Sequence, residues 1–173
     1  EAASIAAKGQ SIWENLVSGL KYIKGDRVLF SLVFMAAAAN LFIFPYSYAL
    51  IPIFARDILN IGASGYGQLM AAAGFGAILG SFTVGALPPA VNRGKLIFVA
   101  FLVWPVTLIF FSYSRLFLLS MALLILAGIA QGISMTLVQT ILLLRSSEEM
   151  RGRVSGARAL AISTLALGTL MTG

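Results

Sequence analysis

Residues 116–144 read LFLLSMALLILAGIAQGISMTLVQTILLL and carry no charge, whereas the next fourteen residues, RSSEEMRGRVSGAR (145–158), carry six of the eighteen charged side chains of the chain. The apolar run is longer than the roughly 18 residues that indicate a membrane-spanning helix. A charged group at the centre of a span costs about 2.5 to 3.5 kcal/mol on insertion scales, so charges are expected to gather in loops. The two stretches therefore predict a membrane helix that is followed by a polar loop.

The composition of the whole chain points the same way. The 173 residues are 60% hydrophobic and 10% charged, whereas soluble globular domains are roughly half apolar and about a quarter charged. Helices buried in soluble proteins can be apolar all round, but this chain has little else to cover them. We therefore expect an all-α integral membrane protein. The spans that the charge-free runs predict are about 28–55, 65–87, 96–114, 116–144 and 157–173.

Residues 1–27 differ from this pattern, because they are too polar to span a membrane. In SIWENLVSGLKYIKGD (11–26) apolar side chains recur on one helical face and polar side chains on the other. Such a helix suits the membrane surface, with Trp13 and Tyr22 near the headgroups; alternatively, it packs on protein that is missing from this chain. We expect residues 1–27 to lie outside the membrane and residues 28–173 to form the membrane domain.

The distribution of basic residues predicts the orientation. If residues 1–27 are placed on one side and every span changes the side, that side receives ten of the twelve Lys and Arg residues. Only Arg56 and Arg115 fall on the other side. Because short cytoplasmic loops retain Lys and Arg, the Glu1 end is expected in the cytoplasm.

Two of the predicted spans contain glycines at the spacing G-x-x-x-G, which lets another helix approach closely. These are the pair Gly76 and Gly80 and the pair Gly128 and Gly132. In the charged loop, Ser146 stands three residues before Glu149, which is the pattern of a capping box. A helix is therefore expected to start near Ser147 and to continue into the last span.

The order of these parts resembles the major facilitator superfamily of membrane transporters. The lead-in W-x-x-L-x-x-G-L-x-Y (13–22) is followed by a long span, a Gly-rich span and a short basic turn, and EEMRGRVSGAR (148–158) is similar to the superfamily's loop between helices ten and eleven. The branch that the chain looks like is that of the enterobactin-exporter-like and macrolide-efflux-like carriers. The resemblance, from about residue 11 to residue 173, implies a partial C-terminal helix bundle.

On this resemblance the five spans are the seventh to eleventh of twelve helices, and residues 1–27 are the end of the central cytoplasmic linker. The chain starts without Met and stops within the apolar run TLALGTLMTG (164–173). We therefore expect a truncated bundle, an internal piece of a longer carrier whose missing N-terminal half is a partner. This piece supplies one wall of a transport cavity and is not expected to transport alone.

Two polar turns resemble cytoplasmic gating regions of the superfamily: residues 85–95, and the charged loop that carries Arg151, Gly152 and Arg153. The motif G-x-L-A-D-R-x-G-R-K has a weak copy in GALPPAVNRGK (85–95), where Leu87 matches but Pro89 stands in place of the Asp. The resemblance implies gating or lipid-anchoring roles for these turns, and the alternative is that their cations only set the topology. The residues concerned are Gly85, Arg93, Lys95, Arg151, Gly152 and Arg153.

The charge-free runs contain no ionisable side chain other than tyrosine, so a coupling proton would be carried elsewhere. Gln131, Met135 and Gln139 share one helical face, because steps of four residues turn by only about 40°. Polar residues at membrane depth line a cavity or hydrogen-bond neighbouring helices, at about 0.6 kcal/mol each. The candidates for contact with substrate are Asn40, Tyr46, Gln68, Gln131, Met135 and Gln139.

The residues also exclude several functions. The chain has no Cys and no His, and it shows no phosphate-binding loop, no paired carboxylates and no nucleophile with a base. We expect no enzyme activity, no cofactor and no metal. We also expect no nucleic-acid partner, because the net charge of +6 reflects cytoplasmic anchoring.

The resemblance implies secondary-active efflux of a small molecule, such as a siderophore or a drug, by alternating access in the bacterial inner membrane. The expected partners are membrane lipid, the transported molecule and the N-terminal half. Two alternatives remain open. One is a membrane scaffold that does not transport, and the other is the permease of an ATP-driven exporter whose nucleotide-binding part is a separate chain.

Overall fold

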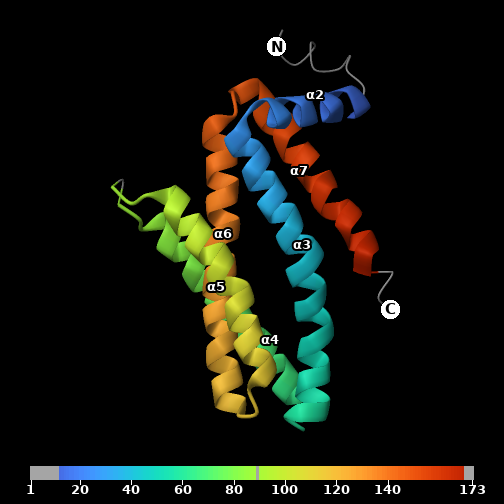
Figure 1. Ribbon diagram of the computed structural model, residues 1–173, viewed down its shortest axis with the longest axis vertical. Helices are drawn as coiled ribbons and strands as arrows, with labels where there is room; N and C mark the ends of the chain where they lie inside the picture. The colour runs from blue at the N-terminus through green and yellow to red at the C-terminus, as the bar shows by residue number, and fades with distance from the viewer. Residues whose placement is uncertain (1–11, 89, 170–173) are drawn as a thin grey trace. The chain divides into compact units, whose positions relative to one another are not determined.

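The computed structural model describes the backbone of residues 12–88 and 90–169, and the side chains of residues 14–43, 51–88 and 90–159 (Figure 1). Every regular element in this part of the chain is a helix. The chain divides into two compact units, which are considered one at a time. The first unit comprises Glu1–Leu41 with Thr140–Gly173, and the second comprises Phe42–Gln139.

The first unit contains an amphipathic helix that turns sharply into an apolar one. Helix α2 (Ile12–Gly25) is followed by α3 (Arg27–Ile53), and the bend between them is 110°. The unit also holds the end of α6 (Phe117–Arg145) and helix α7 (Glu148–Thr169). Its buried apolar side chains come from all four helices: Ile23, Leu29, Leu32, Ala36, Ala39, Leu142, Val154 and Ala157.

Helix α2 packs on α7, as the apolar stripe of the sequence allows. The two helices contact each other along α2, which lies across the beginning of α7 (Figure 1). The approach is closest at Gly19, where an added Cβ atom would stand 2.5 Å from the carbonyl oxygen of Arg153. Ile23 is buried, whereas Leu20, Lys21 and Lys24 are exposed. Part of the apolar face of α2 is therefore covered by this same chain.

The second unit contains the end of α3, helices α4 (Gly62–Gly85) and α5 (Arg93–Tyr113), and most of α6. Helix α3 is continuous to Ile53 and then widens into a short π-helix, η1 (Phe54–Ile58). The connection to α4 uses two residues with positive φ, Asn60 and Gly62, at 52° and 63°. Phe54 packs against Phe111 of α5, with the ring centroids 4.9 Å apart.

The two predicted glycine pairs meet each other. On α4, Gly76 and Gly80 face the backbone of α6, and on α6, Gly128 and Gly132 face the backbone of α4. A Cβ atom at any of the four would overlap a carbonyl oxygen of the opposite helix. Because both helices contribute glycines, their backbones approach without intervening side chains. The carbonyl groups that fill the four positions belong to Ile125, Ile129, Ala73 and Ala77.

Length and composition mark several helices as membrane-spanning. Among the described residues, α4, α5 and α6 are long and apolar enough to cross a membrane, and a fourth span results if α2 and the adjoining part of α3 are counted together. Large apolar side chains such as Phe42, Phe82 and Phe98 are exposed on the helices, which suits contact with lipid. The expected all-α class of membrane protein is thus confirmed.

Candidate functional site

The last turn of α6 carries backbone carbonyl groups that lack partners within the helix. Two of them accept hydrogen bonds from side chains of other helices. The Tyr22 hydroxyl of α2 donates to the carbonyl oxygen of Arg145 at 3.3 Å, and Arg151 Nε of α7 donates to that of Leu143 at 3.2 Å. Side chains from α2 and α7 therefore complete the end of α6.

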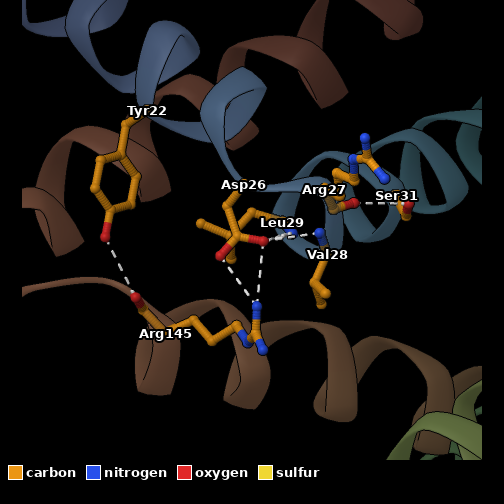
Figure 2. A network of polar contacts seen from close by, with 7 residues as sticks. All are labelled: Tyr22, Asp26, Arg27, Val28, Leu29, Ser31 and Arg145. Atoms are coloured by element: carbon orange, nitrogen blue, oxygen red, sulfur yellow. Dashed lines mark hydrogen bonds and ion pairs between the residues drawn. The ribbon is translucent and has the colours of Figure 1, made fainter.

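Asp26 fixes the corner between α2 and α3. Its Oδ1 accepts hydrogen bonds from the backbone N–H groups of Val28 at 2.8 Å and Leu29 at 3.3 Å, so Asp26 is the N-cap of α3. Its carboxylate also accepts from Arg145 Nη1, at 3.2 Å to Oδ1 and 3.1 Å to Oδ2 (Figure 2). One carboxylate thus caps α3 and holds the end of α6.

The electrostatics of Asp26 favour its charged form. The backbone N–H of Val28 makes the largest contribution to lowering the pKa of the Asp26 carboxyl below its ordinary value. Burial opposes this effect, and the N–H of Leu29 and the Arg145 guanidinium add to the lowering. The carboxylate is therefore ionised at neutral pH and remains paired with Arg145.

These contacts form one set, which we call the terminal network: Tyr22, Asp26, Leu143, Arg145 and Arg151. It joins α2, the start of α3, the end of α6 and the start of α7 within the first unit. Its ion pair, between Asp26 and Arg145, is partly exposed and so contributes little alone. The network acts by bringing four helix ends together.

The predicted gating residues of the charged loop have different surroundings. Arg151 belongs to the terminal network and also lies 3.8 Å from Glu148. Arg153 donates a long hydrogen bond, 3.5 Å, to the Ser18 hydroxyl, and its carbonyl group faces Gly19. Gly152 is exposed, and an added Cβ atom there would meet nothing within 4 Å.

The predicted capping box at the start of α7 is wrong. Helix α7 starts at Glu148, and the N–H groups of Met150 and Arg151 donate to the carbonyl oxygen of Ser147. Ser147 therefore occupies the N-cap position, one residue later than the box requires. The Ser146 hydroxyl oxygen is buried and finds no hydrogen-bond partner within the described chain.

The other predicted gating turn lies in the second unit. Asn92 is the N-cap of α5, because its side chain accepts a hydrogen bond from the N–H of Lys95 at 3.1 Å. Arg93 and Lys95 are exposed in the first turn of α5, where the helix dipole disfavours cations. Neither forms an ion pair with a described residue.

Gly85, at the end of α4, lines an open, mostly apolar hollow of about 470 Å³ with Ser81, Phe82 and Ala86.

The predicted substrate-contact residues do not converge on one described cavity. Gln131, Met135 and Gln139 follow one face of α6 and are each partly exposed. Asn40 donates its amide hydrogen bond to the carbonyl oxygen of Ala36 in its own helix, at 2.8 Å. Gln68 is exposed on α4, and Tyr46 belongs to α3 with its side chain outside the described residues.

The contacts that Tyr22 and Asp26 make in the terminal network are not predicted from the sequence. An Asp directly before an apolar helix is a recognisable N-cap signal, so the capping role of Asp26 could have been predicted. The pairing of Asp26 with Arg145 could not have been predicted, because the two residues lie 119 positions apart. A cross-helix hydrogen bond from Thr136 to Ser81, at 3.1 Å, was equally hidden.

The family model described as Major Facilitator Superfamily matches residues 2–169. No curated protein and no solved structure matches the chain.

Proposed function

The chain belongs to the major facilitator superfamily, whose members carry small molecules across membranes, and from this premise we propose that it is part of a secondary exporter. Its substrate would be a small amphipathic molecule such as a siderophore or a drug. The family match over residues 2–169 is the observation that carries the transport function. The choice of efflux rests on the resemblance of the chain as a whole to the enterobactin-exporter-like and macrolide-efflux-like branch.

The proposed topology has five spans in the bacterial inner membrane, with the Glu1 end in the cytoplasm. The ten-to-two distribution of cations supports this orientation. It also accounts for Arg93 and Lys95, which lie at an unfavourable helix end but on the side that retains positive charge. In a twelve-helix carrier these spans would be the seventh to eleventh, and an N-terminal half would supply the other wall of the cavity.

The proposed mechanism is alternating access, in which two halves rock about a central site. The terminal network would lie at the cytoplasmic ends of its helices. Because it joins the ends of α3, α6 and α7 to α2, we expect these ends to move together during rocking. Arg151 would serve in this way as a structural connection, and Arg93 and Lys95 as anchors to anionic lipid. No covalent chemistry is proposed for any residue.

The proposed substrate contacts lie on the face of α6 that carries Gln131, Met135 and Gln139. Partial exposure of all three in the described chain supports this choice, because part of each residue is accessible to a small molecule. Asn40 is a weaker candidate, since its amide already donates to Ala36. The two glutamines would orient a polar group of the substrate, and Met135 would contact its apolar part.

An efflux assay on the complete carrier tests this proposal. The carrier is expressed in cells that lack their own exporters, and extrusion of a macrolide and of a catecholate siderophore is measured. The double variant Gln131→Ala with Gln139→Ala should change the rate for one of them. The matched control is Thr83→Val, which removes an exposed hydroxyl that donates within α4 to the carbonyl oxygen of Leu79. A wild-type carrier that extrudes neither compound would contradict the proposed export function. Equal extrusion rates for the glutamine double variant and the Thr83→Val control would show that Gln131 and Gln139 do not contact the substrate.

A further inference from the structure

A small polar pocket lies where η1 approaches the turn between α5 and α6. Its volume is about 260 Å³, and all of its residues belong to the second unit. The lining provides a carboxylate from Asp57, a guanidinium from Arg115 and hydroxyl groups from the three residues before it. The complete lining is Asp57, Ile58, Ser112, Tyr113, Ser114 and Arg115.

The backbone around this pocket is well supported. The N–H of Leu59 donates to the carbonyl oxygen of Phe54 at 2.9 Å, the five-residue step of a π-turn, which is frequent at functional sites. Beneath it, Phe54 packs on Phe111. Ser114 is buried and accepts a hydrogen bond from the Ser120 hydroxyl at 2.9 Å. The turn that carries Arg115 is thereby held on both sides.

The position of the pocket along the helices places it at the boundary between membrane and water. Asp57 and Arg115 come directly after the charge-free runs 28–55 and 96–114, apart from Arg56. One helical turn deeper, the same faces carry exposed apolar side chains. These are Ile53 on α3, 50% exposed, and Ile109 and Phe110 on α5, 54% and 60% exposed. The helices that lead to the polar pocket thus carry exposed apolar side chains.

We propose that this pocket binds the headgroup of a zwitterionic phospholipid that carries a primary ammonium group. The ammonium would pair with the Asp57 carboxylate, the phosphate with the Arg115 guanidinium, and the acyl chains would lie along Ile53, Ile109 and Phe110. An ammonium donates hydrogen bonds that the lining hydroxyl oxygens accept, whereas a choline headgroup has no such hydrogens. The lipid is a fixed partner of the carrier here and not its transported substrate.

The size of the pocket and the exposure of its carboxylate favour a lipid over other occupants. The volume of about 260 Å³ is below the roughly 300 to 1,000 Å³ of pockets that enclose drug-sized molecules. A soluble zwitterion would fit the charges but would make no use of the apolar surface below. The carboxylate is also available, because its partner Arg56 is 88% exposed and lies 3.5 Å away, and such surface pairs are weak.

The test measures lipid retention by the purified chain in nanodiscs of defined composition. Nanodiscs contain equal amounts of phosphatidylethanolamine and phosphatidylcholine, and native mass spectrometry counts the lipids that stay bound. The wild type should retain the ethanolamine lipid in preference. Asp57→Asn should reduce that preference by about three- to fivefold, the effect of one exposed ion pair. Arg115→Gln should weaken retention of both lipids, because both carry the phosphate.

The matched control is Arg56→Gln, which removes an exposed charge next to Asp57 but outside the lining. It should keep or raise the preference, since Arg56 competes with the ammonium for the same carboxylate. Equal retention of the two lipids by the wild type would overturn the proposal, and so would an unchanged preference in Asp57→Asn. Displacement of the lipid by free phosphoethanolamine at equal concentration would show that the pocket takes a soluble zwitterion instead.

Discussion

Asp26 and Arg145 lie 119 positions apart in the sequence, and their side chains form a hydrogen-bonded ion pair at 3.1 Å. The same carboxylate caps α3 through the N–H groups of Val28 and Leu29. A single side chain therefore sets the start of one helix and the position of the end of another. Its two roles can be separated by substitution.

Asp26→Asn should lower the thermal stability less than Asp26→Ala. Asparagine caps helices about as well as aspartate but carries no charge, so it removes only the attraction to Arg145. Alanine removes the cap as well. Thermal unfolding in detergent, followed by tryptophan fluorescence, measures both midpoints. Equal midpoints for the two variants would show that the cap of α3 contributes nothing measurable.

Acid should weaken the terminal network through Asp26. The pKa of this carboxyl is lower in the folded chain than its ordinary value, so its contribution is complete above that ordinary value and is lost as the pH falls through the folded value. The midpoint of unfolding should be steady from neutral pH to about pH 5 and fall below it. Asp26→Asn should show a smaller fall. Parallel curves for the two proteins would assign the acid sensitivity to other carboxylates.

Gly76→Leu should destabilise the contact between α4 and α6, because a side chain there meets the backbone of Ile125. Overpacking of this kind costs about 1 to 3 kcal/mol. The matched control is Gly74→Leu in the same helix, where an added Cβ atom meets nothing within 4 Å. Expression level and the unfolding midpoint are compared for both. A loss of stability as large in the control would mean that helix α4 does not tolerate leucine for reasons unrelated to α6.

Gly19→Ala should loosen α2 from α7, because the new methyl group would press on the carbonyl oxygen of Arg153. Trypsin should then cleave after the exposed residues Lys21 and Lys24 faster than in the wild type. Gly25→Ala is the control, since nothing lies within 4 Å of its added Cβ atom. Unchanged cleavage in Gly19→Ala would indicate that the two helices can separate slightly at little cost.

The positions of the helices were predictable from the sequence because charge is excluded from them. Helices α3 to α6 lie over the runs 28–55, 65–87, 96–114 and 116–144 to within a few residues. The amphipathic spacing of residues 11–26 likewise predicts α2. These features depend on local composition and periodicity alone, which a single sequence contains. The two G-x-x-x-G pairs indicated close packing for the same reason.

The partners of these elements were not predictable in the same way. The sequence shows that Gly76 and Gly128 favour close contact, but not that their helices contact each other. The sequence places Arg145 in a charged loop, but it does not show that the Arg145 guanidinium donates to the Asp26 carboxylate. The start of α7 differs by one residue, because Ser146 and Ser147 are equally suitable caps and packing buries the first of them. Such outcomes depend on how distant segments meet in space.

The reciprocal glycine contacts restrict how the second unit can deform. Each of the four glycines faces a carbonyl oxygen of the opposite helix, so sliding α4 along α6 by one residue would press Cβ atoms onto those oxygens. The close packing of the two helices therefore opposes their sliding past each other. Any bending within this unit must occur elsewhere, and Pro105 interrupts the backbone hydrogen bonds in the middle of α5. A bend of α5 at Pro105 would leave the contact between α4 and α6 intact.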